Sequence, residues 1–248
     1  MSAALDTDVN AVVGGYLRDL AFAQSSKRKQ FGYKRAAAIF APDAPLTELL
    51  QPDGSLPRIK GIGPGSTRVI LEVLHSGTLP TVEQAVAGSE SRGEIDRRRS
   101  LRRHYLSRAA VRAILSDASL SGPTLEQYRG DLQMHSEWSD GSPTVGEIAN
   151  ACIARGYLYA AVTDHSYGLR IAGGISMAEA ADHVIAARAL AAGCIFALDS
   201  DAHTIDQLWY AEIAIAHARL AAIPPDRIVN CWPRERLESW LRDPPSVR

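Results

Sequence analysis

The chain has little cysteine, few aromatic residues and no long apolar run. Its 248 residues include only Cys152, Cys194 and Cys231, and aromatic residues make up 6 %. Three cysteines in apolar surroundings build neither a disulfide framework nor a zinc knuckle, so we predict small core residues in a reducing compartment. No apolar run reaches the ~18–20 residues of a membrane span. The first residues do not show a basic segment followed by an apolar one, which is the pattern of a secretion signal. We therefore expect a cytoplasmic protein with no membrane partner.

The chain also lacks a net charge of either sign. Its 27 Lys and Arg residues are offset by 28 Asp and Glu residues, which gives a net charge of −1. This balance argues against a protein that coats nucleic acid through its overall charge, although basic residues cluster locally. One cluster contains Lys27, Arg28, Lys29, Lys34 and Arg35, and the other contains Arg92, Arg97, Arg98, Arg99, Arg102, Arg103, Arg108 and Arg112. The clusters indicate either local contact with phosphates or solvated helix faces.

A glycine-rich turn follows the helical front of the chain. Apolar spacing predicts helices over residues 8–22 and 30–40 and a short helix over 46–50. Gly61-Ile62-Gly63 then places an apolar residue between two glycines, directly before another predicted helix. Glycines allow a tight turn, and free N–H groups at the start of the next helix bind phosphate, which is the helix-hairpin-helix pattern.

This pattern predicts binding to the DNA backbone without reading of the base sequence. The predicted contact residues are Lys60, Gly61, Ile62, Gly63, Gly65, Ser66 and Arg68. A turn that serves only to pack the two helices together is the alternative interpretation.

Asp and His residues recur in three short stretches of the back half. They are Asp131-Leu132-Gln133-Met134-His135 with Asp140, then Thr163-Asp164-His165, and then Asp201-Ala202-His203. The second and third stretches follow the apolar runs 160–162 and 194–198, which read as buried parallel strands. Strands are also predicted near 133–135 and 227–232, with helices over 144–155, 206–220 and 233–241. Because parallel strands end at one edge of a sheet, we expect these side chains to meet there and to hold Zn, Mn or Fe.

These stretches resemble the PHP (polymerase and histidinol phosphatase) superfamily. The resemblance implies a distorted (β/α)₇ barrel that hydrolyses phosphoesters with two or three metal ions. Carried over by position, the metal ligands would be His135, Asp140, His165, Asp201 and His203. Asp164 would orient the His165 ring, and Arg170 would bind a phosphate on the following loop.

Two features depart from the PHP pattern. The family opens with His-x-His, and Gln133 stands where the first of these histidines is expected. Only about 35 residues separate the second stretch from the third, where the family has several strands and further ligands. The resembling part is about 120 residues long, against about 250 for an ordinary closed barrel. We therefore expect a truncated barrel fragment, and a second copy of the chain is a candidate partner that would cover it.

The front, residues 8–87, resembles the N-terminal helical domain of family-X DNA polymerases through 30–39, the hairpin and Gly77-Thr78-Leu79-Pro80. Eukaryotic members carry a Schiff-base lysine where this chain has Val69, so no lyase activity is implied. Residues 88–128 contain no Asp-x-Asp pair, so no polymerase core is expected there. Instead, residues 92–115 form an Arg-rich stretch that is predicted to be helical, before a linker around Gly122-Pro123.

The sequence thus predicts an α + α/β protein in three parts. Residues 1–87 would be an all-helical helix-hairpin-helix domain, 88–128 an Arg-rich linker, and 129–248 a PHP-like (β/α) fragment. The expected function is DNA binding joined to metal-dependent phosphoester hydrolysis. Two alternatives stay open: a DNA-binding module whose PHP part has lost its metal and its activity, and a small-molecule phosphatase of the histidinol-phosphatase type.

Overall fold

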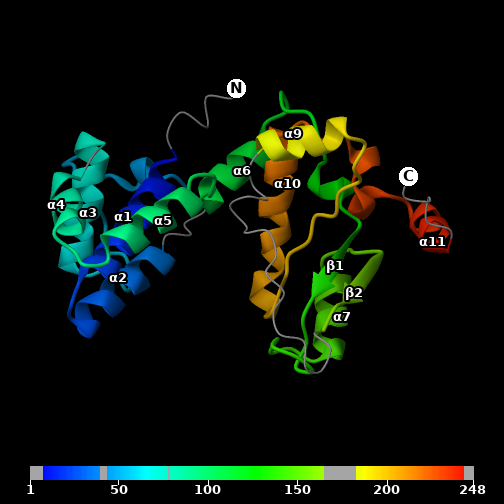
Figure 1. Ribbon diagram of the computed structural model, residues 1–248, viewed down its shortest axis with the longest axis horizontal. Coiled ribbons are helices and arrows are strands. Elements are labelled where there is room, and N and C mark those ends of the chain that lie inside the picture. The colour runs from blue at the N-terminus through cyan, green and yellow to red at the C-terminus, as the bar shows by residue number, and fades with distance from the viewer. Residues whose placement is uncertain (1–7, 40–43, 78, 165–182, 243–248) are drawn as a thin grey trace. The chain divides into compact units, whose positions relative to one another are not determined.

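The computed structural model describes residues 8–39, 44–77, 79–164 and 183–242. The chain forms two compact units, a helical unit up to Ala113 and an α/β unit from Ile114 onward (Figure 1). Helices predominate, and the described strands form one small parallel sheet. None of the described helices is both long and apolar enough to cross a membrane.

The helical unit contains α1 (Val9–Ala23), α2 (Lys27–Ile39), a 3₁₀ turn (Leu46–Leu49), α3 (Pro64–Ser76), α4 (Pro80–Ala87) and α5 (Arg92–Leu101). The predicted helices of the front are therefore present, with boundaries shifted by a few residues. Val13 and Leu17 of α1 are buried among side chains of the later helices, including Ile70, Val82 and Ile95. Because α1 packs against each of its neighbours through one apolar face, it is the central helix of this unit.

The Arg-rich stretch differs from the single helix predicted over 92–115. It forms α5 and a second helix, α6 (Arg108–Ser116), separated by residues 102–107. Arg99 of α5 donates to Asp19 (2.7 Å) and Glu83 (2.9 Å). Arg102, directly after α5, also donates to Asp19, whose side chain is 4 % exposed. A buried carboxylate needs such partners, so these two arginines attach α5 to the helical unit instead of facing a ligand.

The α/β unit is built around a two-stranded parallel sheet. Strand β1 (Gly130–Met134) pairs with β2 (Tyr159–Val162) through the crossover helix α7 (Val145–Ala154). Thr144 and Glu147 form a reciprocal capping box at the start of α7. A Cβ at Gly130 would overlap the backbone and ring of Tyr159, so a glycine is required where these strands approach each other.

Two predicted strands are wrong. Residues 194–198 and 227–232 share only one isolated bridge, between Phe196 and Ile228. The second of these segments follows a 3₁₀ turn that begins at Pro225 (Pro225–Arg227), and it contains another 3₁₀ turn, Val229–Cys231, in place of a strand. Cys194, predicted to lie in the core, is exposed. The described residues therefore form no barrel.

The remaining elements are α9 (His183–Ala191), a 3₁₀ turn (Ile205–Trp209), α10 (Tyr210–Leu220) and α11 (Arg234–Arg242). Arg219 of α10 is 5 % exposed, and its guanidinium donates to four backbone carbonyls, of Ile114, Asp117, Leu120 and Pro123. These carbonyls lie in the last turn of α6 or just after its end, where few backbone N–H groups are in position to donate to them. Arg219 therefore caps α6 and fixes the segment that leads into β1.

Candidate metal centre

Three chain segments end side by side at one edge of the sheet. The N–H of Thr163, after β2, donates to the carbonyl of Met134 (2.8 Å). On the other side of β1, the N–H of His135 donates to Ala202 (2.9 Å), and the N–H of Asp201 donates to Gln133 (3.1 Å). Since these bonds align the ends of all three segments, the three Asp/His stretches of the sequence are neighbours in space.

The side chains of His135, Asp201 and His203 converge closely enough to share one metal ion. One ligand atom from each lies within 4.8 Å of the others. The Nε2 atom of His135 is 3.1 Å from Oδ1 of Asp201, and Asp140 Oδ2 is 3.4 Å from Nε2 of His203. Two atoms bound tetrahedrally to Zn²⁺ at about 2.1 Å lie about 3.4 Å apart, so these spacings match a metal site.

The tautomer of His203 is fixed by the backbone. Its Nδ1 lies 2.8 Å from the carbonyl oxygen of Asp201, which can only accept a hydrogen bond. When the ring carries a single proton, that proton is therefore on Nδ1, which leaves Nε2, the nitrogen nearest Asp140, to bind a metal ion. Metal-binding histidines in proteins are commonly oriented in this way by a carbonyl group.

Asp140 is presented by a tight turn that follows β1. Ser136 donates to Asp164 from its N–H (2.7 Å) and its hydroxyl, and the Ser139 hydroxyl donates to the same carboxylate (2.7 Å). Partial burial raises the pKa of Asp164, but these hydrogen bonds outweigh it and hold the pKa below its ordinary value. Asp164, predicted to orient His165, is thus the residue that holds the turn carrying Asp140.

Gln133 contacts the site as a hydrogen-bond donor. Its side-chain amide donates to Oδ1 of Asp201 (3.0 Å), the same oxygen that faces His135. Asp201 has a left-handed backbone, with φ of 54°, which is uncommon outside glycine and is often found at functional sites. The amide therefore orients the Asp201 carboxylate where the family pattern has an imidazole ligand.

Two carboxylates behind the centre, the buried Asp131 and the half-buried Asp199, were not predicted as site residues. Asp131 is fully buried and accepts hydrogen bonds from the N–H groups of Gln133 and Ser200. Burial raises its pKa to about 6, and burial also raises the pKa of Asp199, which accepts from Leu132 and Asn230. For Asp131, the position of a carboxylate inside the predicted strand was the available sequence signal. These bonds join β1 to the segment that carries Asp201 and His203.

Of the five predicted metal ligands, the structure brings together His135, Asp140, Asp201 and His203. His165 and the predicted phosphate-binding Arg170 lie outside the described residues. In the helical unit, the predicted DNA-binding residues occupy the turn before α3 and its first two turns. Lys60, Gly63, Gly65 and Arg68 are exposed, Ile62 packs against the core, and Ser66 is buried.

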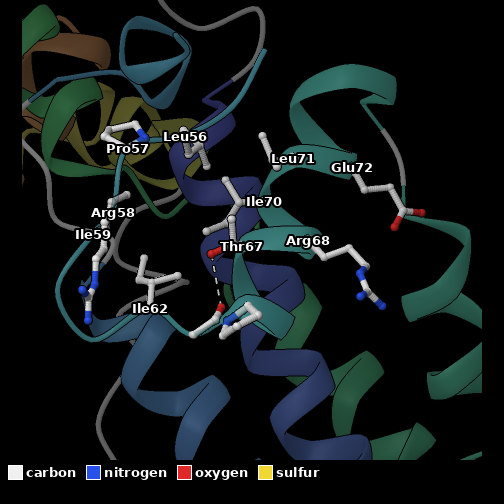
Figure 2. A pocket seen from close by; sticks show the side chains of 12 residues that line it. Leu56, Pro57, Arg58, Ile59, Ile62, Thr67, Arg68, Ile70, Leu71 and Glu72 are labelled. Atoms are coloured by element: carbon white, nitrogen blue, oxygen red, sulfur yellow. Dashed lines mark hydrogen bonds between the residues drawn. The ribbon is translucent and has the colours of Figure 1, made fainter. Parts of the chain in front are cut away.

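The hairpin borders an open apolar groove of about 940 Å³ between the 56–63 segment and α3 (Figure 2). Figure 2 shows the Arg58 and Arg68 side chains extending away from it, and Thr67 donating to the carbonyl of Gly63 (3.2 Å). Gly61 has φ of 88°, which favours glycine, whereas Gly63 has φ of −89° and open space where a Cβ would lie. Gly63 therefore keeps the start of α3 accessible, and Gly61 makes the turn.

The centre is of the class in which histidine and carboxylate ligands gather at the carboxyl ends of parallel strands. No family model matches the chain. A stretch of 52 residues is 54 % identical to the DNA polymerase/3'-5' exonuclease PolX of Bacillus subtilis (strain 168). The match covers 21 % of this chain and 9 % of that relative. The chain thus contains a region related to PolX and spans only a small part of the relative's length.

Proposed function

We propose that this protein binds DNA through its helical unit and hydrolyses phosphoesters at a PHP-type metal centre in its α/β unit. The observation that carries the proposal is the convergence of His135, Asp201 and His203, with Asp140 beside them, at the end of a parallel sheet. The related region in PolX, whose name describes a DNA polymerase and exonuclease, supports DNA as the partner. Cytoplasmic location remains part of the proposal.

The residues present fit a divalent transition metal. Two imidazoles and two carboxylates are ligands that Zn, Mn and Fe accept, and the fixed tautomer of His203 leaves Nε2 for coordination. A bound ion of this kind lowers the pKa of a water molecule and so supplies a nucleophile near neutral pH. The chain's own contribution is to orient the carboxylates, through Gln133 at Asp201 and through the turn held by Asp164 at Asp140.

For the helical unit, we propose contact with the DNA backbone at the start of α3. Gly63 and Gly65 leave room for a phosphate beside the first turn, where helix N–H groups lack intrahelical acceptors. Lys60 and Arg68 are exposed near this turn and add positive charge. Such contacts position the protein on DNA without selecting a base sequence.

One observation favours the alternative of an inactive centre. Gln133 offers an amide hydrogen to Asp201, and an amide is a weaker ligand for a transition metal than the expected imidazole. The inactive form would keep DNA binding and lose metal. The third alternative, a small-molecule phosphatase, gives the exposed hairpin no role.

Metal content separates the proposed function from an inactive centre. After dialysis, we expect at least one Mn, Zn or Fe per chain in the wild type and its loss in His203→Ala, measured by plasma mass spectrometry. His75→Ala, which removes an exposed imidazole from the last turn of α3, should keep the metal. Mn²⁺-stimulated hydrolysis of a phosphodiester should disappear only in His203→Ala, with DNA affinity unchanged. A wild type without metal would instead support the inactive alternative.

A further inference from the structure

Among the described residues of the α/β unit, Trp138 has the most exposed large apolar side chain. It is 80 % exposed, whereas Trp232 is 2 % exposed and Trp209 and Trp240 are half-buried. Indole is the largest apolar side chain, and leaving it in water forgoes the free energy that its burial supplies. An exposed tryptophan on a well-held turn is therefore available to a ligand or a partner.

The turn that carries Trp138 is held by hydrogen bonds on both sides of the residue. The N–H of Trp138 donates to the Ser136 hydroxyl (3.3 Å), and the N–H of Glu137 donates to the carbonyl of Pro143 (2.9 Å). The Ser139 hydroxyl donates to Asp164. A Cβ at Gly141 would overlap the backbone of His135, so the turn is also pressed against the end of β1. These contacts hold the backbone of Trp138 in place, so the indole projects from a fixed position.

The same turn forms part of the candidate metal centre. Trp138 lies two residues before Asp140, whose carboxylate faces both His135 and His203. After Asp140, the N–H of Ser142 donates to the carbonyl of His203 (2.8 Å). The turn is therefore also bound to the segment that carries Asp201 and His203. A phosphoester bound at this centre would have its neighbouring groups close to the turn that bears Trp138.

Resting on the proposed function, we propose that Trp138 is a specificity-determining residue that stacks on a nucleobase next to the scissile phosphate. Every base has a flat π-face, and indole stacks on such faces without reading their hydrogen-bonding edges. The substrate class would then be nucleotides or nucleic-acid ends with an unpaired base, and sugar phosphates without a base would be poor substrates. The sequence-tolerant stacking matches the backbone-only contact proposed for the hairpin.

The test compares two ligands in three forms of the full chain. The ligands are a dithymidine with a phosphorothioate linkage and the same molecule with its terminal base replaced by hydrogen. Their dissociation constants are measured calorimetrically in Mn²⁺ for the wild type, Trp138→Ala and Trp138→Phe. We expect Trp138→Ala to weaken the base-bearing ligand about 5- to 150-fold, the range that stacking of one base represents, and to leave the abasic ligand unchanged. Trp138→Phe should keep most of the affinity.

Two results would overturn the role of Trp138. Either the wild type binds both ligands equally, or Trp138→Ala weakens both by the same factor, which would indicate a structural role for the indole. The metal content of Trp138→Ala, expected to equal that of the wild type, separates this inference from the proposed function. Metal without base preference contradicts the stacking role alone, whereas base preference without metal supports stacking and contradicts the phosphoesterase.

Discussion

At the scale of single residues, the carboxylate of Asp131 behind the candidate metal centre departs clearly from its ordinary ionisation. Asp131 is fully buried. Its carboxylate accepts hydrogen bonds from the backbone N–H of Gln133 in β1 and from that of Ser200 in the neighbouring segment 199–203. The N–H groups stabilise the charged form, but burial outweighs them and raises the pKa to about 6. The folded protein therefore holds this proton to a higher pH than the unfolded chain does.

This difference predicts how stability depends on pH. Between pH about 4 and about 6 the folded state binds more protons at Asp131 than the unfolded state, so the free energy of unfolding falls as pH rises. A pKa of about 6 against the ordinary 3.8 corresponds to about 3 kcal/mol. Asp131→Asn removes this titration. Urea unfolding at each pH gives the free energy of unfolding of the wild type and of the variant. The wild-type value minus the variant value should fall as pH rises from about 4 to about 6. A difference that does not change with pH would contradict the raised pKa of Asp131.

Gly141 gives a second prediction at this scale. Because an added Cβ would overlap the carbonyl of His135, Gly141→Ala should displace the turn that carries Asp140 and lower metal content. Gly146→Ala in α7 is the matched control, since its Cβ would make only an ordinary contact, 3.9 Å from the Thr144 hydroxyl. The control should keep the metal and raise the free energy of unfolding by about 1 kcal/mol, the helix preference of Ala over Gly. Equal metal content in both variants would show that the turn is not needed.

At the scale of elements, the α/β unit is held together less by its small sheet than by polar connections between segments. The two strands of the sheet are short, and the third segment joins through the single bridge between Met134 and Ala202. Asn230 extends these connections, because its amide donates to the carbonyl of Gly130 (2.9 Å) and accepts from the N–H of Leu198 (2.7 Å). Such buried polar bonds fix the register of segments that have no continuous ladder.

The capping of α6 by Arg219 can also be tested through the free energy of unfolding. Arg219→Met keeps much of the side-chain volume but removes the guanidinium donors to four carbonyls, of which those of Ile114 and Asp117 keep a backbone N–H donor. Losing buried partners of this kind should lower the free energy of unfolding by about 3 kcal/mol, measured by urea denaturation. Arg234→Met, which removes an exposed i,i+4 ion pair with Glu238, should change it by less than about 0.5 kcal/mol. Similar values for the two variants would argue against the capping role.

At the scale of the whole molecule, the division into two units predicts that DNA binding and metal binding are separable. Gly63→Val places a branched side chain into the open space before α3 without a strained backbone, so the helical unit should fold normally. We expect weaker binding to duplexes of any sequence and a smaller dependence of affinity on salt, because phosphate contacts are lost. Fluorescence anisotropy on two unrelated duplexes measures both effects.

The control for this prediction is Gly88→Val, at the exposed end of α4, where an added Cβ meets only an ordinary contact of 3.6 Å. It should bind DNA like the wild type, and both variants should keep their metal. A change of sequence preference in Gly63→Val would contradict a contact limited to the backbone.

The sequence by itself determined the helices of the front, the glycine turn, both strands of the sheet and the association of the Asp/His stretches. These follow from local apolar periodicity and from the rule that parallel strands end at one edge. The tertiary structure alone decided which polar groups meet. In the folded chain, Gln133 donates a hydrogen bond to Asp201, Ser139 donates one to Asp164, and Arg99 forms an ion pair with Asp19. Such pairings join residues far apart in the chain, and local patterns carry no information about which buried donor finds which acceptor.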